Sequence, residues 1–305
     1  MKARLDTTEF SRFHKDHVSF PPLLRELHDG PDTLFIRGNP DLLSRPMIAM
    51  VGSRQASRQG CLNAFSLARA LSHRGITVIS GLARGIDAAA HKGALTGQGS
   101  TVAILGTGID KTYPAAHDQL AREIAEKGLL VSSFPLGAPP EKWHFPRRNR
   151  IIAALALGCV VVEAGLTSGS IITARIAADL GREVFALPGS IHSPLSRGCH
   201  QLLREGAQLV ETVYDILNEI PDFRALARQP NLFPPDDCPA PPLGREEGRV
   251  LALLTPGPLT VDQISQGTGL TSRQVSLMLI TLELLGHVAP LPGGRFERLV
   301  INGYS

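Results

Sequence analysis

The sequence has few cysteines and no long apolar segment. Its four cysteines, Cys61, Cys159, Cys199 and Cys238, are far apart and form no CxxC pair, so they indicate neither a zinc site nor a disulfide framework. No apolar stretch is long enough to cross a bilayer, and the N-terminus lacks a signal-type apolar run with a small-residue cleavage site. We therefore expect no membrane association and a cytoplasmic location.

Neither sign of charge predominates. The formal net charge is only +3, so the overall charge does not point to a polyanionic partner, and any basic patch must be local. Six of the 31 basic residues are lysines, and the rest are arginines. Arginine favours bidentate contacts with phosphate, but GC-rich coding also enriches arginine, so the composition alone leaves both explanations open.

The common motifs for nucleotide binding and catalysis are missing. The turn after the first predicted strand reads GSRQASRQG, which lacks the GxGxxG pattern, and no GxxxxGK[ST], GxSxG or HExxH is present. Asp87 and Glu163 are the best-placed acids, but no second carboxylate follows at metal-ligand spacing. Asp87 and His91 are four apart on a predicted helix, where a cap and a packed histidine are favoured over a metal or acid–base pair. We expect no catalytic residue, metal or cofactor.

Short apolar runs alternate with helical segments through most of the chain. The runs predict buried parallel strands at 48–52, 77–81, 101–106, 129–134, 159–164 and 183–189. Segments between them, such as 61–74 and 170–180, have helical spacing, which predicts right-handed crossovers. The expected fold class is α/β: a doubly wound, mostly parallel, Rossmann-like domain over residues 46–220, preceded by a packed lead-in over residues 1–45.

A smaller unit is predicted after this domain. Residues 221–243 are rich in proline and short of apolar periodicity, so they predict a linker. Residues 244–305 predict a winged helix-turn-helix, with three helices and a hairpin that has a Pro-Gly-Gly tip. Thr260 and Thr271 stand at N-cap positions, and Gly267 and Gly269 bracket the predicted turn.

Glycine, hydroxyl and arginine residues gather where the predicted strands end. Doubly wound sheets bind ligands at these ends, and glycine lets backbone N–H groups approach an anion closely. Glycines also simply close tight turns, but several such turns together, two of them with an arginine, favour an anion site. The residues are Gly52, Ser53, Arg54, Ser80, Gly81, Arg84, Ser168, Gly169 and Ser170.

A cationic and aromatic segment lies between the fourth and fifth predicted strands. Residues 147–150 read RRNR and open a predicted helix, with Lys142, Trp143 and Phe145 just before it. Aromatic rings beside cations suit a nucleic-acid strand, because bases stack on the rings and phosphates pair with the cations. A surface helix start with a buried Phe and Trp explains the pattern equally well. We expect at least one of the arginines to have a structural role.

Several segments in the same order resemble the DNA-processing protein A (DprA or Smf) family. They read SGLARGIDAAAHKGAL, GTGIDKTYP, FPRRNRIIAAL, VVVEAGLTSGSIITARIAADLGREVFALPGSI and SRGCHQLLREGA, and the similarity covers about residues 18–220. The resemblance implies an extended Rossmann-like fold that binds single-stranded DNA, forms dimers, and loads the RecA recombinase onto DNA during natural transformation, without being an enzyme. The C-terminal unit resembles the winged-helix domain that many members carry.

The resemblance also implies roles for individual residues. Arg54 is the implied phosphate contact, and Lys142 and Phe145 are the implied cation and base-stacking ring. Further contacts are implied for Ser80, Gly81, Arg84, Arg148, Asn149, Ser168, Gly169 and Ser170, with Gly52 and Ser53 beside Arg54. Two features depart from the family pattern. The sequence starts close to its Rossmann-like part, so we expect the helical N-terminal domain of longer members to be absent or reduced. His117 stands where asparagine is expected.

Two other functions remain open. One is a nucleotide phosphoribohydrolase of the lysine-decarboxylase-like (LOG) type, but SGSIITA has no following glutamate and PGG occurs only at 292–294. The other is a transcription regulator whose winged helix reads duplex DNA. Against it, the predicted recognition helix over residues 271–285 has one cationic residue, Arg273, whereas duplex readers usually carry more.

A dimer interface is predicted near the end of the large domain. Leu202, Leu203, Ile216 and Leu217 have spacings that can form an apolar stripe on the last helices. Core packing is favoured for Leu202 and Leu203. Ile216 and Leu217 end the domain beside the linker, so we expect them to be exposed and to contribute to a symmetric dimer.

Overall fold

The computed structural model divides the chain into two compact units. It describes residues 10–224, 245–254, 257–284, 287–291 and 293–298. The first unit comprises residues 1–229 and the second residues 230–305. In the described part of the chain, no helix combines the length and the apolar character that crossing a membrane requires.

A nine-stranded sheet forms the centre of the first unit. The strands lie in the order β1-β2-β6-β5-β4-β3-β7-β8-β9, and those from β3 onward run parallel. Their bounds are β1 (Ser11–His14), β2 (Thr33–Gly38), β3 (Met47–Val51), β4 (Thr77–Ser80), β5 (Thr101–Leu105), β6 (Leu129–Ser132), β7 (Gly158–Val161), β8 (Glu183–Ala186) and β9 (Gln208–Leu209). Each of the six predicted apolar runs overlaps a strand, and the predicted doubly wound, mostly parallel fold is confirmed.

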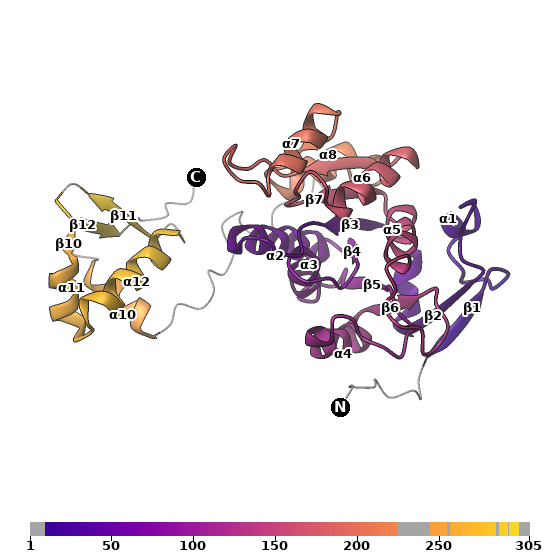
Figure 1. Cartoon of the computed structure of the whole chain (residues 1–305), viewed down its shortest axis with the longest axis horizontal. Helices are drawn as coiled ribbons and strands as arrows, with labels where there is room; N and C mark the ends of the chain where they lie inside the picture. The colour runs from indigo at the N-terminus through magenta and orange to yellow at the C-terminus, as the bar shows by residue number, and fades with distance from the viewer. Residues whose placement is uncertain (1–9, 225–244, 255–256, 285–286, 292, 299–305) are drawn as a thin grey trace. The chain divides into compact units, whose positions relative to one another are not determined.

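Helices cover both faces of the sheet (Figure 1). The core on one face includes residues of α2 (Arg58–His73), α3 (Ile86–Ala94) and α8 (Val213–Glu219), and α4 (Asp118–Lys127) packs against β2, β5 and β6 in a cluster that also includes α3. The core on the other face includes residues of α1 (Pro22–Arg25), α5 (His144–Leu155), α6 (Gly169–Asp179) and α7 (Arg197–Arg204). Short 3-10 helices lie at η1 (Pro40–Ser44), η2 (Ala115–His117) and η3 (Pro221–Phe223).

The central strand β3 shows why the apolar runs form this sheet. All five of its residues are buried. Met47, Ala49 and Val51 belong to the core on the α5–α6 face, whereas Ile48 and Met50 belong to the core on the α2–α3 face. Side chains alternate across a strand, so a strand with helices on both faces needs an unbroken apolar run.

The lead-in joins the same sheet and the same core. β1 pairs with β2, and β2 pairs with β6, both antiparallel. Phe20 and Leu24, between β1 and β2, are completely buried. The start of the chain therefore extends the sheet by two antiparallel strands that were not predicted.

The predicted exposure of Ile216 and Leu217 is wrong. Both side chains are completely buried in the core on the α2–α3 face, together with Phe223 of η3. The reason is that α8 and η3 fold back over this core, whereas the prediction had the domain ending in an open edge. Leu202 is buried and Leu203 partly buried in the opposite core, as core packing predicts.

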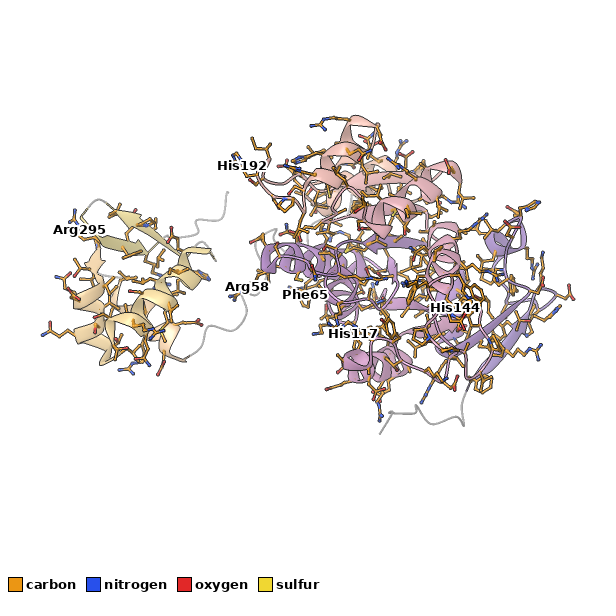
Figure 2. All side chains as sticks on the ribbon, in the orientation of Figure 1. Arg58, Phe65, His117, His144, His192 and Arg295 are labelled. Carbon is orange, nitrogen blue, oxygen red and sulfur yellow. The ribbon has the colours of Figure 1, made fainter. Side chains whose placement is uncertain are left out.

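The second unit is a winged helix. Three helices, α10 (Arg245–Leu253), α11 (Val261–Thr268) and α12 (Ser272–Leu284), accompany a three-stranded sheet of order β10-β12-β11. The strands are β10 (Leu259–Thr260), β11 (Val288–Leu291) and β12 (Arg295–Arg298), and Figure 2 labels Arg295 at the start of β12.

Capping residues define the helix boundaries of this unit. Thr260 caps α11 in a capping box with Gln263, as predicted. Gly269 ends α11 with a φ of 75°, a left-handed conformation that glycine adopts easily. Gly267, predicted to bracket the turn together with Gly269, lies inside α11, where a Cβ would come 2.8 Å from a methyl carbon of Leu253. It is a close-packing position, and only Gly269 belongs to the turn.

Candidate nucleic-acid interface

A cavity lies where the winding of the sheet reverses. The chain runs outward from β3 through β4, β5 and β6, then returns to β7 beside β3 and continues to β8 and β9. Ligands of doubly wound sheets bind at such a switch point, outside the carboxyl ends of the strands. A cavity of about 610 Å³ occupies this position. The predicted site residues that line it are Gly52, Ser53, Arg54, Arg148, Asn149, Ser168, Gly169 and Ser170.

The N-terminus of α6 forms one wall of the cavity. Ser168 is the N-cap, and its Oγ accepts a hydrogen bond from the backbone N–H of Ser170 at 3.3 Å. The hydroxyls of Ser168 and Ser170 are 2.5 Å apart. Apart from its chain neighbours and the backbone of its own helix, no atom lies within 4 Å of the place that a Cβ of Gly169 would take, so this end of the helix is open. Helix N-termini favour anions, because their N–H groups and the helix dipole point outward.

Arg54 and Phe145 stand together at the rim. Arg54 is exposed, and its guanidinium carbon lies 5.3 Å from the centroid of the half-buried Phe145 ring. The guanidinium carbon of Arg148 lies 5.9 Å from the same centroid. The Tyr113 ring is 5.8 Å away, and Tyr113 is 46% exposed. This cluster places aromatic and cationic groups beside a cavity suited to anions.

Arg148 is the arginine with a structural role that the sequence predicted. It is only 4% exposed, and its Nη1 donates to the carbonyl of Ile104 at 3.3 Å. A Cβ on Gly81 would lie 1.2 Å from this Nη1, so Arg148 fits only because residue 81 has no side chain. Burial lowers the pKa of Arg148 to about 10, and Asp87 acts in the opposite direction, so the guanidinium stays charged at neutral pH.

Asp87 holds the loop that follows β4. Its Oδ2 accepts hydrogen bonds from the backbone N–H groups of Gly81 at 3.1 Å and Ala83 at 3.3 Å. Burial raises the pKa of Asp87, while the charge of Arg148 and these N–H groups act to lower it. The acid is thus a buried loop anchor.

His91 is a packed histidine that supports the same loop. Its Nε2 accepts from the backbone N–H of Leu82 at 3.2 Å, so the proton is on Nδ1, which is 2.7 Å from the Thr101 hydroxyl. Burial, with help from Arg148, lowers the pKa of His91 to about 3. The prediction of a packed histidine is confirmed.

His117 completes the support of this loop. Its Nδ1 donates to the carbonyl of Leu82 at 2.9 Å. Leu82 has a φ of 58°, an uncommon conformation for a side chain of this kind, and bonds to both its N–H and its carbonyl hold it there. The side chain of His117, which departs from the family pattern, thus serves as a hydrogen-bond donor to this loop. Figure 2 labels His117, and His144 at the start of α5.

Some predicted contact residues lie elsewhere. Ser80 is completely buried and its hydroxyl donates to the carbonyl of Met50 at 2.6 Å, while Gly81 is buried beneath Arg148. We correct their predicted role from contact to support, because neither reaches the surface. Arg84 and Lys142 are exposed but, like Phe145, do not line the cavity.

Glu163 has a role that the sequence did not reveal. Its carboxylate accepts hydrogen bonds from the Ser57 hydroxyl at 2.5 Å and the Ser57 backbone N–H at 2.8 Å, at the N-terminus of α2. A Cβ on Gly60 would lie 2.4 Å from the carboxyl carbon, so the fit is close. In Rossmann folds, the helix after the first parallel strand holds the phosphates of a dinucleotide at its N-terminus. Here that helix is α2, and the internal carboxylate of Glu163 occupies its N-terminus.

The sequence model of the DNA recombination-mediator protein A family matches residues 12–221. This chain belongs to that family. The model of the DprA winged helix domain matches residues 234–294. Protein Smf of Escherichia coli strain K12 is 41% identical over 291 residues, covering 92% of this chain and 75% of that protein. The DNA processing protein DprA of Streptococcus pneumoniae is 45% identical over 214 residues, covering 69% and 76%. The family resemblance read from the sequence is confirmed.

Solved structures of family members share the fold. The X-ray structure of DNA processing protein A from Streptococcus pneumoniae matches with a TM-score of 0.67 at 45% identity, over 70% of this chain and 75% of that chain. The protein from Helicobacter pylori matches with a TM-score of 0.64 at 30% identity, over 69% of this chain and 95% of that chain. The Helicobacter protein is described in terms of its binding mode for single-stranded DNA.

Proposed function

We propose that this protein binds single-stranded DNA at the switch-point cavity and acts in DNA processing during DNA uptake, natural transformation and recombination. The observation that carries the proposal is the cavity itself. It combines the open N-terminus of α6 with Arg54 and Arg148, in a fold shared with a relative described for single-strand binding.

The predicted contacts at the cavity have the following roles in this proposal. A phosphate binds at the N-terminus of α6, where the hydroxyls of Ser168 and Ser170 and the Arg54 guanidinium donate to it. Asn149 adds a donor in the cavity, and Arg148 supplies charge from its floor. Gly52 lets the turn after β3 pack closely against its neighbours. A Cβ at this position would come 2.5 Å from a side-chain carbon of Ile86 and 2.9 Å from the Glu163 carbonyl oxygen.

Phe145 is the proposed stacking surface for a base. Lys142 and Arg84, both exposed, add phosphate contacts outside the cavity. A base can lie on the Phe145 ring only when it is free of its partner strand, so this arrangement favours single strands over duplex. Stacking of this kind contributes roughly 1–3 kcal/mol per base.

We propose that the protein binds DNA without chemical change. The two acids that the sequence singled out are engaged inside the fold: Glu163 accepts hydrogen bonds from Ser57, and Asp87 accepts hydrogen bonds from the loop after β4. This use of both carboxylates gives no support to a phosphoribohydrolase. The winged helix gives little support to a duplex-reading regulator, since Arg273 is the one cationic residue of α12.

Two partners are proposed from the family resemblance alone. The protein forms a homodimer and transfers the bound strand to the RecA recombinase. A mass that stays near 32.7 kDa at every concentration in light scattering would rule out the dimer. RecA filaments that assemble on the coated strand no faster than on naked DNA would rule out the transfer.

One titration tests the binding function. Labelled single-stranded DNA, duplex of the same length and a mononucleotide are each titrated at two salt concentrations. We expect the single strand to bind most tightly, with affinity that falls as salt rises, because phosphate contacts release counterions. Equal affinity for single strand and duplex would contradict the proposal. Tighter binding of the mononucleotide would favour a nucleotide enzyme instead.

A further inference from the structure

Trp143 is an exposed aromatic residue that the proposed site does not use. It is the only tryptophan of the sequence and precedes the first residue of α5. Trp143 is 51% exposed, and neighbouring residues cover the rest of it. The Phe134 ring lies 5.9 Å from it at 81°, and its indole N–H donates to the Glu141 carboxylate. These contacts fix the orientation of a ring that remains open to solvent.

Arg147 stands beside this ring. Its guanidinium carbon is 5.7 Å from the Trp143 centroid, as expected for residues four apart on a helix. Arg147 is exposed, and among the described residues no carboxylate pairs with it. Arg150, one turn further along, is paired with Asp29 at 3.3 Å. Arg147 is therefore a cation available to a phosphate, next to a ring available to a base.

Trp143 and Phe145 lie on different sides of the start of α5. Residues two apart on a helix do not face each other. Arg148 and Asn149 line the switch-point cavity on one side of the helix, whereas Arg147 and Arg150 line a second cavity, of about 580 Å³, on the other. A DNA single strand that passes from Phe145 over the N-terminus of α5 therefore reaches Trp143 and Arg147.

We propose that Trp143 and Arg147 form a second contact point for the same single strand, with a base stacked on the indole and a phosphate paired with the guanidinium. This inference rests on the proposed single-strand binding. A helix with its side chains is about 10–12 Å across, which corresponds to about three nucleotides at the spacing of 3.4 Å per nucleotide of a B-form strand. The second contact point thus lies a few nucleotides beyond the base on Phe145, and only longer strands occupy both.

The fluorescence of the full-length protein tests this directly, because Trp143 is its only tryptophan. A labelled oligothymidylate of about sixteen nucleotides, the upper end of the usual site size, is titrated while its anisotropy and the tryptophan emission are recorded together. We expect the emission to be quenched in step with the anisotropy. We also expect Trp143→Ala to weaken binding about fivefold or more, and Trp143→Phe, which keeps a ring, to change it less than about twofold.

Two further variants sharpen the result. Arg147→Gln should reduce the slope of log affinity against log salt by about 0.7, the value for one phosphate contact on a single strand. Tyr214→Ala is the matched control, because Tyr214 also has an arginine over its ring, with Arg74 at 5.2 Å, but belongs to the core on the opposite face of the sheet. It should leave DNA affinity unchanged.

The readouts separate this inference from the binding function. An anisotropy change without quenching, together with wild-type affinity of Trp143→Ala, would overturn the second contact point and leave single-strand binding intact; the exposed ring would then serve a protein contact. Quenching without any loss of affinity in Trp143→Ala would also overturn it, since the ring would only report nearby DNA. No anisotropy change at all would refute single-strand binding itself. Because quenching is measured on the unaltered protein, an anisotropy change without quenching by itself contradicts the stacked indole, even if Trp143→Ala does not fold.

Discussion

Replacing Gly81 with alanine should displace Arg148 and damage both the fold and the binding site. The new Cβ would lie 1.2 Å from Nη1 and 2.2 Å from Cζ of Arg148. Ordinary carbon contacts are about 3.5–4 Å, so the guanidinium must move by about 2 Å. Arg148 is buried and bonded to the Ile104 carbonyl, so its guanidinium can move only by giving up this bond and shifting toward the cavity that it lines.

Two effects contribute to the expected loss of stability. Overpacking of a core costs about 1–3 kcal/mol. If the guanidinium moves away, the buried Asp87 also loses part of the favourable charge interaction with Arg148, which adds to this cost. Because both effects act together, we expect a loss near the upper end of the overpacking range, about 3 kcal/mol, which lowers the melting temperature of a unit of this size by about 6–12 °C. Single-strand affinity should fall about tenfold, the value of one charge-assisted hydrogen bond.

Thermal melting by circular dichroism and anisotropy titration measure these changes. Gly165→Ala is the control for stability, because no atom lies within 4 Å of its new Cβ, and it should cost less than about 0.5 kcal/mol. A double-mutant cycle identifies the cause: in an Arg148→Ala background the clash is gone, and Gly81→Ala should cost little more. If Gly81→Ala and Gly165→Ala melt together, the close approach of Arg148 to Gly81 is not a constraint and the reasoning fails.

Three other outcomes follow from the structure. Arg54→Ala should weaken single-strand binding by about 1–3 kcal/mol without changing the melting curve, because the side chain is exposed; unchanged affinity would refute the phosphate contact. The pKa of His91 is about 3 when folded and 6.5 as a free side chain, so its contribution to stability is complete above pH 6.5 and is lost as pH falls below it, by about 1.4 kcal/mol per unit. His91→Gln should remove this slope, and comparing the two proteins cancels the opposite effect of Asp87; parallel pH curves would contradict the assignment. A chain truncated after Gln229, beyond the buried Phe223, should fold and bind single strands nearly as well as the whole protein, and loss of most affinity would place the winged helix in the site.

The sequence predicted the parallel strands well because burial on both faces leaves continuous apolar runs. The search for such runs missed β1 and β2, because these strands are not buried on both faces. In β2 only Leu34 and Ile36 are buried, and in β1 only Phe13 is, so their apolar residues alternate with exposed or half-buried ones and produce no run. It missed β9 because that strand has only two residues, both exposed.

The site was predicted in outline, since glycines and hydroxyls at strand ends point to a switch-point cavity. The direction of each side chain could not be predicted. Ser80 ends β4 as Ser53 follows β3, yet the Ser80 hydroxyl turns inward to Met50 while Ser53 lines the cavity. Long-range contacts could not be predicted either. The Ser57 hydroxyl donates a hydrogen bond to the Glu163 carboxylate 106 positions away in the sequence, and no local pattern indicates this contact.

The Glu163 carboxylate acts as a permanent competitor at the start of α2. A tethered group has an effective concentration on the order of millimolar or more, and it cannot diffuse away. A free nucleotide that approached this helix would have to displace an anion of like charge that is already hydrogen-bonded to Ser57. The α6 end of the cavity has no such internal anion among the residues that line it, apart from Asp87, whose Oδ2 is bonded to backbone N–H groups. A ligand with one phosphate at α6 and further attachments elsewhere, such as a polymer, is thereby favoured over a compact dinucleotide that needs α2.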